Sequence, residues 1–327
     1  LKMKKNSPII DEIRKDFRHK LIQENNKFEK LGRLKDFSYV DLPGIKLNEG
    51  RFSNCNFKNA NLKGASLEFC GLDDAMLAGA NLEGANLTSA GLGGAYLQKA
   101  NLKGTKIQQA NLEGAKLQGA NLEGADLYEA EMQKSNFKNA NLKGASLEFC
   151  TLKGANLEGA NLEGADLHET ELSGANLKGA SLYKVTGSNA HIFDTNLEGA
   201  DLREAYLGHS EMQRSNLKGA KLKKANLEQV DLQDAKLKGA DLTEAYLEWT
   251  DFRGADLQGA NLEGAILYKA FLQGANLKNA NLKGARYDDE TRFQRGFNPE
   301  ERGMTKENPL SSESQYDTAL QPDEDMY

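Results

Sequence analysis

A five-residue period is the feature that most constrains the fold of this chain. From residue 42 to residue 287 of the 327-residue sequence, units such as Ala60-Asn61-Leu62-Lys63-Gly64 repeat fifty times in one register. The third place is nearly always Leu, and the first is mostly Ala. On an α-helix, residues five apart advance by about 140°, which would scatter the Leu side chains around every side. On a flat strand, an odd spacing would send successive Leu to opposite faces. Neither element can bury this pattern.

A path that turns a corner every five residues can bury it, because each corner returns the next Leu to the same interior. The Ala two residues earlier then also points inward, while Asn or Asp and the two residues after Leu face outward. The Gly that often precedes Ala suits a turn position with φ > 0. The repeat therefore predicts a solenoid.

The number of sides follows from a weaker period of twenty. Asn recurs at 61, 81, 101, 121, 141 and 161, and the residues two positions on alternate between Lys and Glu. Four units per coil would place these side chains in one column about 4.8 Å apart, as a ladder of opposite charges. Residues 56–70 are identical to residues 136–150, a shift of 80 residues that preserves the coil phase.

These A-(N/D)-L-x-x units, over residues 41–287, resemble the pentapeptide-repeat family. The resemblance implies an all-β solenoid, namely a right-handed, quadrilateral (four-sided) β-helix, and the handedness rests on the resemblance alone. At about 4.8 Å per coil, about twelve coils would form a rod about 60 Å long.

The N-terminal segment, residues 1–40, is basic, with 11 Lys or Arg against 6 acidic residues. Ser7 and Pro8 are typical of a helix start, and apolar residues follow at helical spacing: Ile10, Ile13, Phe17 and Leu21. We expect a short helical cap over the open first coil, as solenoids need. The alternative is a basic amphipathic helix that docks on a membrane or an acidic partner, although its own acidic residues weaken that interpretation.

The C-terminal side divides into two parts. Residues 285–299 resemble a tail that follows the repeats in many cyanobacterial proteins, with Gln294 and Asn298 where Pro and Asp are usual, and we assign residues 288–304 to a C-terminal cap. We expect Tyr287, Phe293 and Phe297 to fold over the last coil as a C-terminal cap. Residues 305–327 carry six acidic residues and one Lys without apolar periodicity, which predicts a disordered acidic tail.

No pattern of catalytic or ligand-binding residues stands out. The three cysteines, Cys55, Cys70 and Cys150, take the Ala place and should point inward as apolar fillers. We find no zinc spacing, phosphate loop or nucleophile motif, so we expect no catalytic, cofactor-binding or metal-binding residues, no cofactor and no enzyme. The net charge of −6, the missing signal peptide and the missing apolar span favour a cytoplasmic protein that binds neither nucleic acid nor membrane.

One outer face differs from the others in composition. On the face centred on Leu67, Leu87 and Ile107, aromatic and His side chains gather with acidic ones. They are Phe69, Tyr128, Phe149, His168, Tyr206, His209, Tyr246, Trp249 and Tyr268. Exposed aromatics with acids on a rigid scaffold are typical of a partner-binding strip. The alternative is that the rings stack along the rod and shield its backbone from water.

The same face carries a defect in the repeat. In the unit around residues 185–189, Gly187 replaces the central Leu and Val185 takes the Ala place. Loss of a buried Leu costs about 2–5 kcal/mol unless neighbours close the gap. Either Val185 supplies the missing volume or the coil bulges, and we expect a local distortion of the coil near the middle of the rod.

Three functions compete at this point. The leading hypothesis is a non-enzymatic scaffold for an unknown protein partner, acting as a monomer or as a dimer through a cap. The alternative, taken from the resemblance, is a DNA-mimicking protein that interacts with and protects a topoisomerase such as gyrase. That role needs strong negative potential along the rod, whereas residues 41–304 carry only −6. An enzyme is the third hypothesis, and it has neither a motif nor a pocket.

Overall fold

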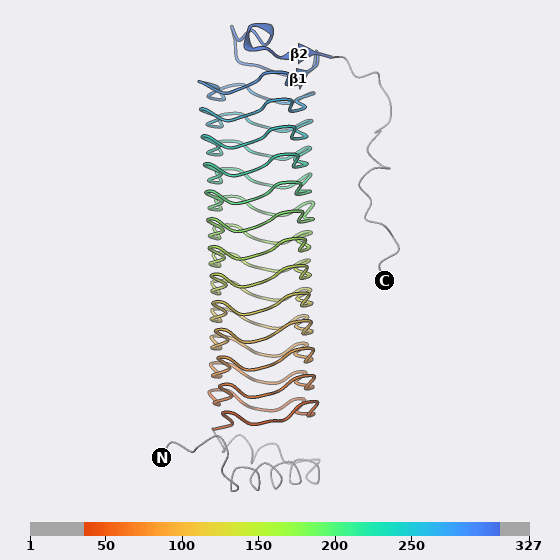
Figure 1. Ribbon diagram of the computed structural model, residues 1–327, viewed down its shortest axis with the longest axis vertical. Coiled ribbons are helices and arrows are strands. Elements are labelled where there is room, and N and C mark those ends of the chain that lie inside the picture. The colour runs from red at the N-terminus through yellow and green to blue at the C-terminus, as the bar shows by residue number, and fades with distance from the viewer. Residues whose placement is uncertain (1–35, 308–327) are drawn as a thin grey trace.

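The chain forms a straight rod of stacked coils (Figure 1). The computed structural model describes residues 36–307. Each pentapeptide contributes one bridge residue, a buried Leu, a two-residue turn and a buried Ala. The parallel bridges step by twenty residues, as in Asn61–Asn81 and Asn81–Asn101. Four units therefore complete one coil, as the twenty-residue period predicted.

Each corner is a hydrogen-bonded turn. In the unit of Leu62, the amide of Ala65 donates to the Leu62 carbonyl over 3.0 Å, and Gly64 has φ +64°. A positive φ at the third residue of such a turn is the requirement of type II geometry. The amides of Leu62 and Gly64 donate to the next coil, to the carbonyls of Asn81 (2.7 Å) and Glu83 (2.8 Å). Each turn thus contributes to the ladder that joins neighbouring coils.

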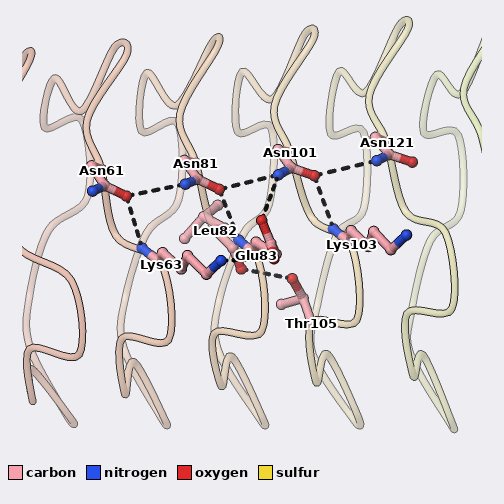
Figure 2. Close-up of polar contacts among 9 residues, drawn as sticks. All are labelled: Asn61, Lys63, Asn81, Leu82, Glu83, Asn101, Lys103, Thr105 and Asn121. Atoms are coloured by element: carbon pink, nitrogen blue, oxygen red, sulfur yellow. Dashed lines mark hydrogen bonds and ion pairs between the residues drawn. The ribbon is translucent and has the colours of Figure 1, made fainter.

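The core is one continuous column of Leu and Ala side chains, with the variants Phe52, Phe57 and Phe137 also fully buried. Several hydroxyls and thiols at the Ala place donate to a carbonyl in the preceding coil, as Thr105 does to Leu82 over 2.8 Å (Figure 2). Ser135 and Ser215 instead donate to the Met carbonyl of their own turn. Cys70 and Cys150 likewise donate to the carbonyls of Leu47 and Leu127 over 2.9 Å. Burial raises the pKa of the Cys70 thiol to about 11 and that of Cys150 to about 12, so both are protonated at neutral pH. All three cysteines are buried, as their place in the repeat predicted, and none of them forms a disulfide.

The Asn column is a hydrogen-bonded ladder on the surface. Asn81 donates through Nδ2 to Oδ1 of Asn61 over 3.1 Å, and Asn101 donates to Asn81 over 3.2 Å (Figure 2). Beside it, the alternating charges pair across coils, as predicted: Lys63 with Glu83 at 2.9 Å, and likewise Lys103–Glu123 and Lys143–Glu163. The hydrogen bond from Lys63 lowers the pKa of the Glu83 carboxyl.

The solenoid begins one unit earlier than predicted. Asp36 already bridges to Asn56, and Phe37 takes the Leu place with 3% of its surface exposed. Its ring stacks on Phe57 with centroids 4.8 Å apart. The aromatic ring fills the Leu position, so the boundary at residue 41 was wrong. Residues 1–35, which hold the predicted helical cap, lie outside the described residues.

The C-terminal end is covered by residues 286–307. Strand β1 (Arg286–Tyr287) pairs in parallel with β2 (Thr305–Lys306), and the 3-10 helix η1 (Glu300–Arg302) precedes β2 (Figure 1). The Phe293 ring packs edge-on against Tyr287 at 5.6 Å and stacks on Phe297 at 4.9 Å. Strand β2 lies in the segment assigned from sequence to the acidic tail, so residues 305–307 are a correction to that boundary. Residues 308–327 lie outside the described part.

The coil around Gly187 is regular, so the predicted distortion was wrong. Thr186 bridges to Asp166 and Tyr206 in the usual register, and Gly187 donates to the Tyr206 carbonyl over 2.8 Å. A Cβ at Gly187 would meet Leu207 Cδ2 and Leu167 Cβ at 3.0 Å. The neighbouring Leu side chains therefore close the gap, and the coil does not bulge.

Candidate protein-binding face

The face singled out from the sequence is one continuous side of the rod. Its backbone is the ladder of bridges that runs from Lys46 through Ser66 and every twentieth residue to Ile266. We call the outward side chains of this column, those of residues 46, 48 and 49 and every twentieth residue after each up to Lys269, the aromatic face. All nine predicted residues lie on it, since they occupy its bridge and turn positions.

Several of the nine side chains are well exposed. Phe69 is 60% exposed, Trp249 42%, Phe149 40% and Tyr206 38%. His209 is also exposed, and Tyr128, His168, Tyr246 and Tyr268 are half-buried. The face thus presents apolar rings to solvent in both halves of the rod.

Stacking along the rod explains part of this arrangement. Tyr128 and Phe149, in neighbouring coils, pack edge to face with centroids 5.6 Å apart. Lys269 lies over the Trp249 ring, with Nζ 4.7 Å from its centroid. Phe149 and Trp249 nevertheless keep two-fifths of their surface in water. The shielding interpretation therefore accounts for the contacts and leaves the exposed area unexplained.

The turns of this face hold a feature that the sequence analysis missed. All twelve left-handed turn positions carry a side chain, whereas Gly occupies 23 of the 38 equivalent positions on the other three faces. The twelve are Glu49, Phe69, Ser89, Gln109, Glu129, Phe149, Glu169, Asn189, His209, Gln229, Trp249 and Lys269. A non-Gly residue with positive φ costs about 1 kcal/mol. The missing Gly in this column was readable from the sequence once the twenty-residue coil was known.

The charge of the face is also distinct. From Gln108 to Tyr268 it carries no Lys or Arg, and its charged side chains are seven carboxylates: Asp126, Glu129, Glu148, Asp166, Glu169, Glu228 and Glu248. The opposite face, centred on Phe57 and Leu77, carries nine Lys and three acidic residues between positions 56 and 279. Charge is therefore segregated across the rod, although the sum over the rod is small.

Two side chains of the face have shifted pKa values because of their surroundings. Burial, with a smaller contribution from Glu228 one coil below, raises the pKa of the Glu248 carboxyl to about 7. Burial, together with a hydrogen bond to Glu307 (2.5 Å), raises the pKa of the Tyr268 hydroxyl to about 12. Glu248 is thus partly protonated near neutral pH, while Tyr268 stays neutral and joins the face to the C-terminal cap.

Within residues 36–307, no cluster of three or more His, Cys, Asp or Glu side chains could hold a metal ion. No helix in that same part of the chain is long and apolar enough to cross a membrane. His168 Nδ1 contacts the Asp166 carboxylate and His191 Nδ1 contacts Glu211 across one coil, but these pairs lie on different faces. The surface chemistry on offer is apolar contact, hydrogen bonding and negative charge.

A four-sided parallel solenoid with a five-residue unit defines a class of repeat proteins. The pentapeptide-repeat model matches eight copies, over residues 36–70, 65–104, 105–144, 145–182 and 245–284. A second model, of a pentapeptide repeat region, matches residues 188–262. These matches span most of the sequence, and the chain belongs to the pentapeptide repeat family, whose known members are right-handed β-helices.

Solved structures of the family resemble this chain. One is HetL, a pentapeptide repeat protein involved in heterocyst differentiation regulation from the cyanobacterium Nostoc sp. strain PCC 7120. It is 30% identical over 82% of this chain and 94% of that chain, with a TM-score of 0.31. QnrB1, a plasmid-mediated fluoroquinolone resistance protein, is 20% identical over 57% and 92%, with a TM-score of 0.41. A pentapeptide repeat protein from the cyanobacterium Cyanothece 51142 is 28% identical over 42% and 91%, with a TM-score of 0.28. No curated protein sequence matches the chain.

Proposed function

We propose that this protein is a non-enzymatic scaffold that docks another protein on its aromatic face. The observation that carries the proposal is the set of twelve side chains held at left-handed turn positions of that one face. Gly would be easier for the backbone at each of them. Retention of side chains in every coil of one face, and in fewer than half of the positions elsewhere, supports a role for what those side chains contact.

Exposed aromatic rings support the same role. Trp and Tyr dominate the energetics of protein interfaces because they bury a large rigid area and lose little conformational entropy. Tyr206 lies two coils before Tyr246, and Trp249 lies in the same repeat unit as Tyr246, on a surface held rigid by the backbone ladder. The rod would present them without rearrangement.

The proposal extends to the whole chain. It takes the rod to have about twelve coils, capped by a helix in the residues before Asp36, and the protein to act in the cytoplasm as a monomer or as a dimer through a cap. The DNA-mimic alternative requires negative potential around and along the rod. The nine Lys of the face opposite the aromatic face do not favour it.

The test is recovery of a partner from native cell lysate by the immobilised full chain, read out by mass spectrometry. The triple variant Tyr206→Ala, Tyr246→Ala, Trp249→Ala should lose a protein that the unaltered chain retains. The matched control is Tyr96→Ala, Tyr183→Ala, Phe193→Ala, which removes one outward aromatic from each of the other three faces. Recovery that survives the first triple variant and fails with the control would contradict the proposal.

A further inference from the structure

We propose that the occupant of the aromatic face is a Lys- or Arg-rich, extended segment of the partner protein. This inference rests on the proposed function and names the chemistry of the partner. Two observations on this face carry it: among the described residues, its carboxylates between Gln108 and Tyr268 form no ion pair with Lys or Arg, and exposed rings lie among them.

Carboxylates on the other three faces are often neutralised by the rod itself. Ion pairs with Lys or Arg recur there, among them Lys138–Glu158 at 3.1 Å, Lys134–Glu113 at 2.9 Å and Arg214–Asp194 at 2.7 Å. Among the described residues, none of the seven carboxylates between Gln108 and Tyr268 on the aromatic face pairs with Lys or Arg. Asp126 and Glu129 accept from Gln108 and Gln109 at 2.6 and 2.8 Å, which are neutral donors. The face therefore keeps most of its negative charge.

The rings give this charge a preference for cations that can stack. A guanidinium or ammonium group over Trp, Tyr or Phe is attracted by the ring electrons, and Arg can also bind a carboxylate in a bidentate way. The rod contains such contacts already: Lys269 lies 4.7 Å from the Trp249 centroid, and Lys116 lies 3.6 Å from that of Tyr96. On the aromatic face, Phe149 lies between Glu148 and the coil of Asp166 and Glu169, so one Arg could meet a ring and a carboxylate together.

The length of the aromatic face favours a peptide segment, rather than a small cation, as its occupant. From Asp126 to Glu248 the column spans six coils, about 29 Å at 4.8 Å per coil. An extended chain covers that length with about nine residues at 3.3 Å each. A small cation would neutralise one or two coils and leave the remaining carboxylates and rings in water.

A second copy of this chain is the competing occupant, because the opposite face of the rod is basic. That face carries Gly at eight of its thirteen left-handed turn positions, and some of its Lys are already paired, as in Lys138–Glu158 and Lys178–Glu198. A contact between two flat rods would also leave the protruding rings between them. These features favour a flexible segment that can fit around the rings.

The test uses fluorescein-labelled twelve-residue peptides with alternating Arg and Ser, Lys and Ser, or Glu and Ser, and the full chain. Fluorescence anisotropy should detect the Arg peptide, with the Lys peptide about threefold weaker or more, and no binding of the Glu peptide. Affinity for the Arg peptide should fall at least about tenfold between 50 and 300 mM salt.

Two matched variants separate the aromatic face from overall charge. The first is Asp126→Asn, Glu148→Gln, Asp166→Asn, Glu169→Gln. It removes four negative charges, keeps at each position a side-chain oxygen that can accept a hydrogen bond, and should weaken binding of the Arg peptide about tenfold. The control is Asp73→Asn, Asp74→Asn, Glu171→Gln, Asp234→Asn on the adjacent face. It changes the net charge equally and should change the affinity for the Arg peptide by no more than about twofold. Trp249→Gly, which keeps the left-handed turn, should also weaken binding.

Equal loss in the two charge variants, or no binding of the Arg peptide, would overturn the inference. A molecular mass by light scattering that rises with concentration at low salt and is reduced by Lys178→Gln, Lys218→Gln, Lys238→Gln would identify a second copy as the occupant and also overturn it. If a lysate partner still depends on the aromatic residues in either case, the proposed function stands while its chemistry changes. If the Arg peptide binds and no such partner exists, the proposed function fails separately.

Discussion

At the scale of single residues, each left-handed turn position holds either Gly, which adopts a positive φ without strain, or a residue whose side chain reaches the surface at the cost of backbone strain. Gly164 and Glu169 lie in successive turns of one coil, with φ +62° and +51°. No atom lies within 4 Å of a Cβ built on Gly164, so a side chain there meets only backbone strain. Gly164→Ala therefore measures the strain without a change in packing, and Glu169→Gly measures its relief together with the loss of the Glu side chain.

We predict that Gly164→Ala lowers the free energy of unfolding by about 1 kcal/mol, the cost of a Cβ in the left-handed region. Glu169→Gly should raise it by about 0.5 kcal/mol, because relief of strain exceeds the entropy that Gly adds to the unfolded chain. Guanidinium unfolding monitored by circular dichroism measures both. A loss of stability in Glu169→Gly would mean that the side chain stabilises the rod, which would weaken the argument for a partner.

Glu248 offers a second test at this scale, through pH. The pKa of Glu248 in the folded state, about 7, lies above the value of 4.5 for an unperturbed Glu. At a pH between these two values the folded state therefore holds a proton that the unfolded state has lost. Its contribution to stability is full below pH 4.5 and is lost as pH rises through 7. Glu248→Gln should therefore be more stable than the unaltered chain by about 2 kcal/mol at pH 8 and equal to it near pH 4.5. A difference that is constant across this range would exclude titration of Glu248 as its cause.

At the scale of one coil, Gly187 shows how the stack absorbs a missing Leu. Gly187→Ala places a Cβ 3.0 Å from Leu167 Cβ and Leu207 Cδ2, and such overpacking should lower the free energy of unfolding by about 1–3 kcal/mol. Gly208→Ala, one coil further on the same face, meets the Glu228 carbonyl at 3.4 Å and should change it by less than about 0.5 kcal/mol. Thermal unfolding compares the two. A stabilising Gly187→Ala would show that the coil can open as the sequence had predicted.

This coil also marks what the sequence could and could not predict. The return of Leu every five residues dictates the interior, because no other path buries it, and the same rule placed Cys70 and Cys150 inward and all nine aromatic and His residues on one face. The closure around Gly187 depends on how the Leu207 side chain turns, which no repeat pattern contains. The aromatic face and the missing Gly at its turns were readable from the sequence, but the exposure of its rings and its unpaired carboxylates required coordinates.

At the scale of the whole molecule, a solenoid must end its ladder at both ends. The regular bridge step of twenty residues becomes twenty-one at Phe271–Arg292, where Asp288 accepts hydrogen bonds from the amides of Lys269, Glu290 and Thr291. The amide of Gly284 donates to Gly303 over 2.7 Å, and that of Thr305 donates to Ala285 over 2.9 Å. The C-terminal segment thus changes the register and then occupies hydrogen-bonding groups that a further coil would have used.

The aromatic cluster that holds this segment down should therefore prevent end-to-end association. In Phe293→Ser, Phe297→Ser the stacked pair at 4.9 Å is lost, and the freed edge groups of the last coil can pair with another chain. Light scattering should then show a mass that rises with protein concentration, while Phe193→Ser, on the side of the rod, should leave the mass unchanged. A variant that melts at a lower temperature without a change in mass would mean that the segment stabilises the last coil but does not block association. End-to-end association of two rods would then be prevented by something other than this cap.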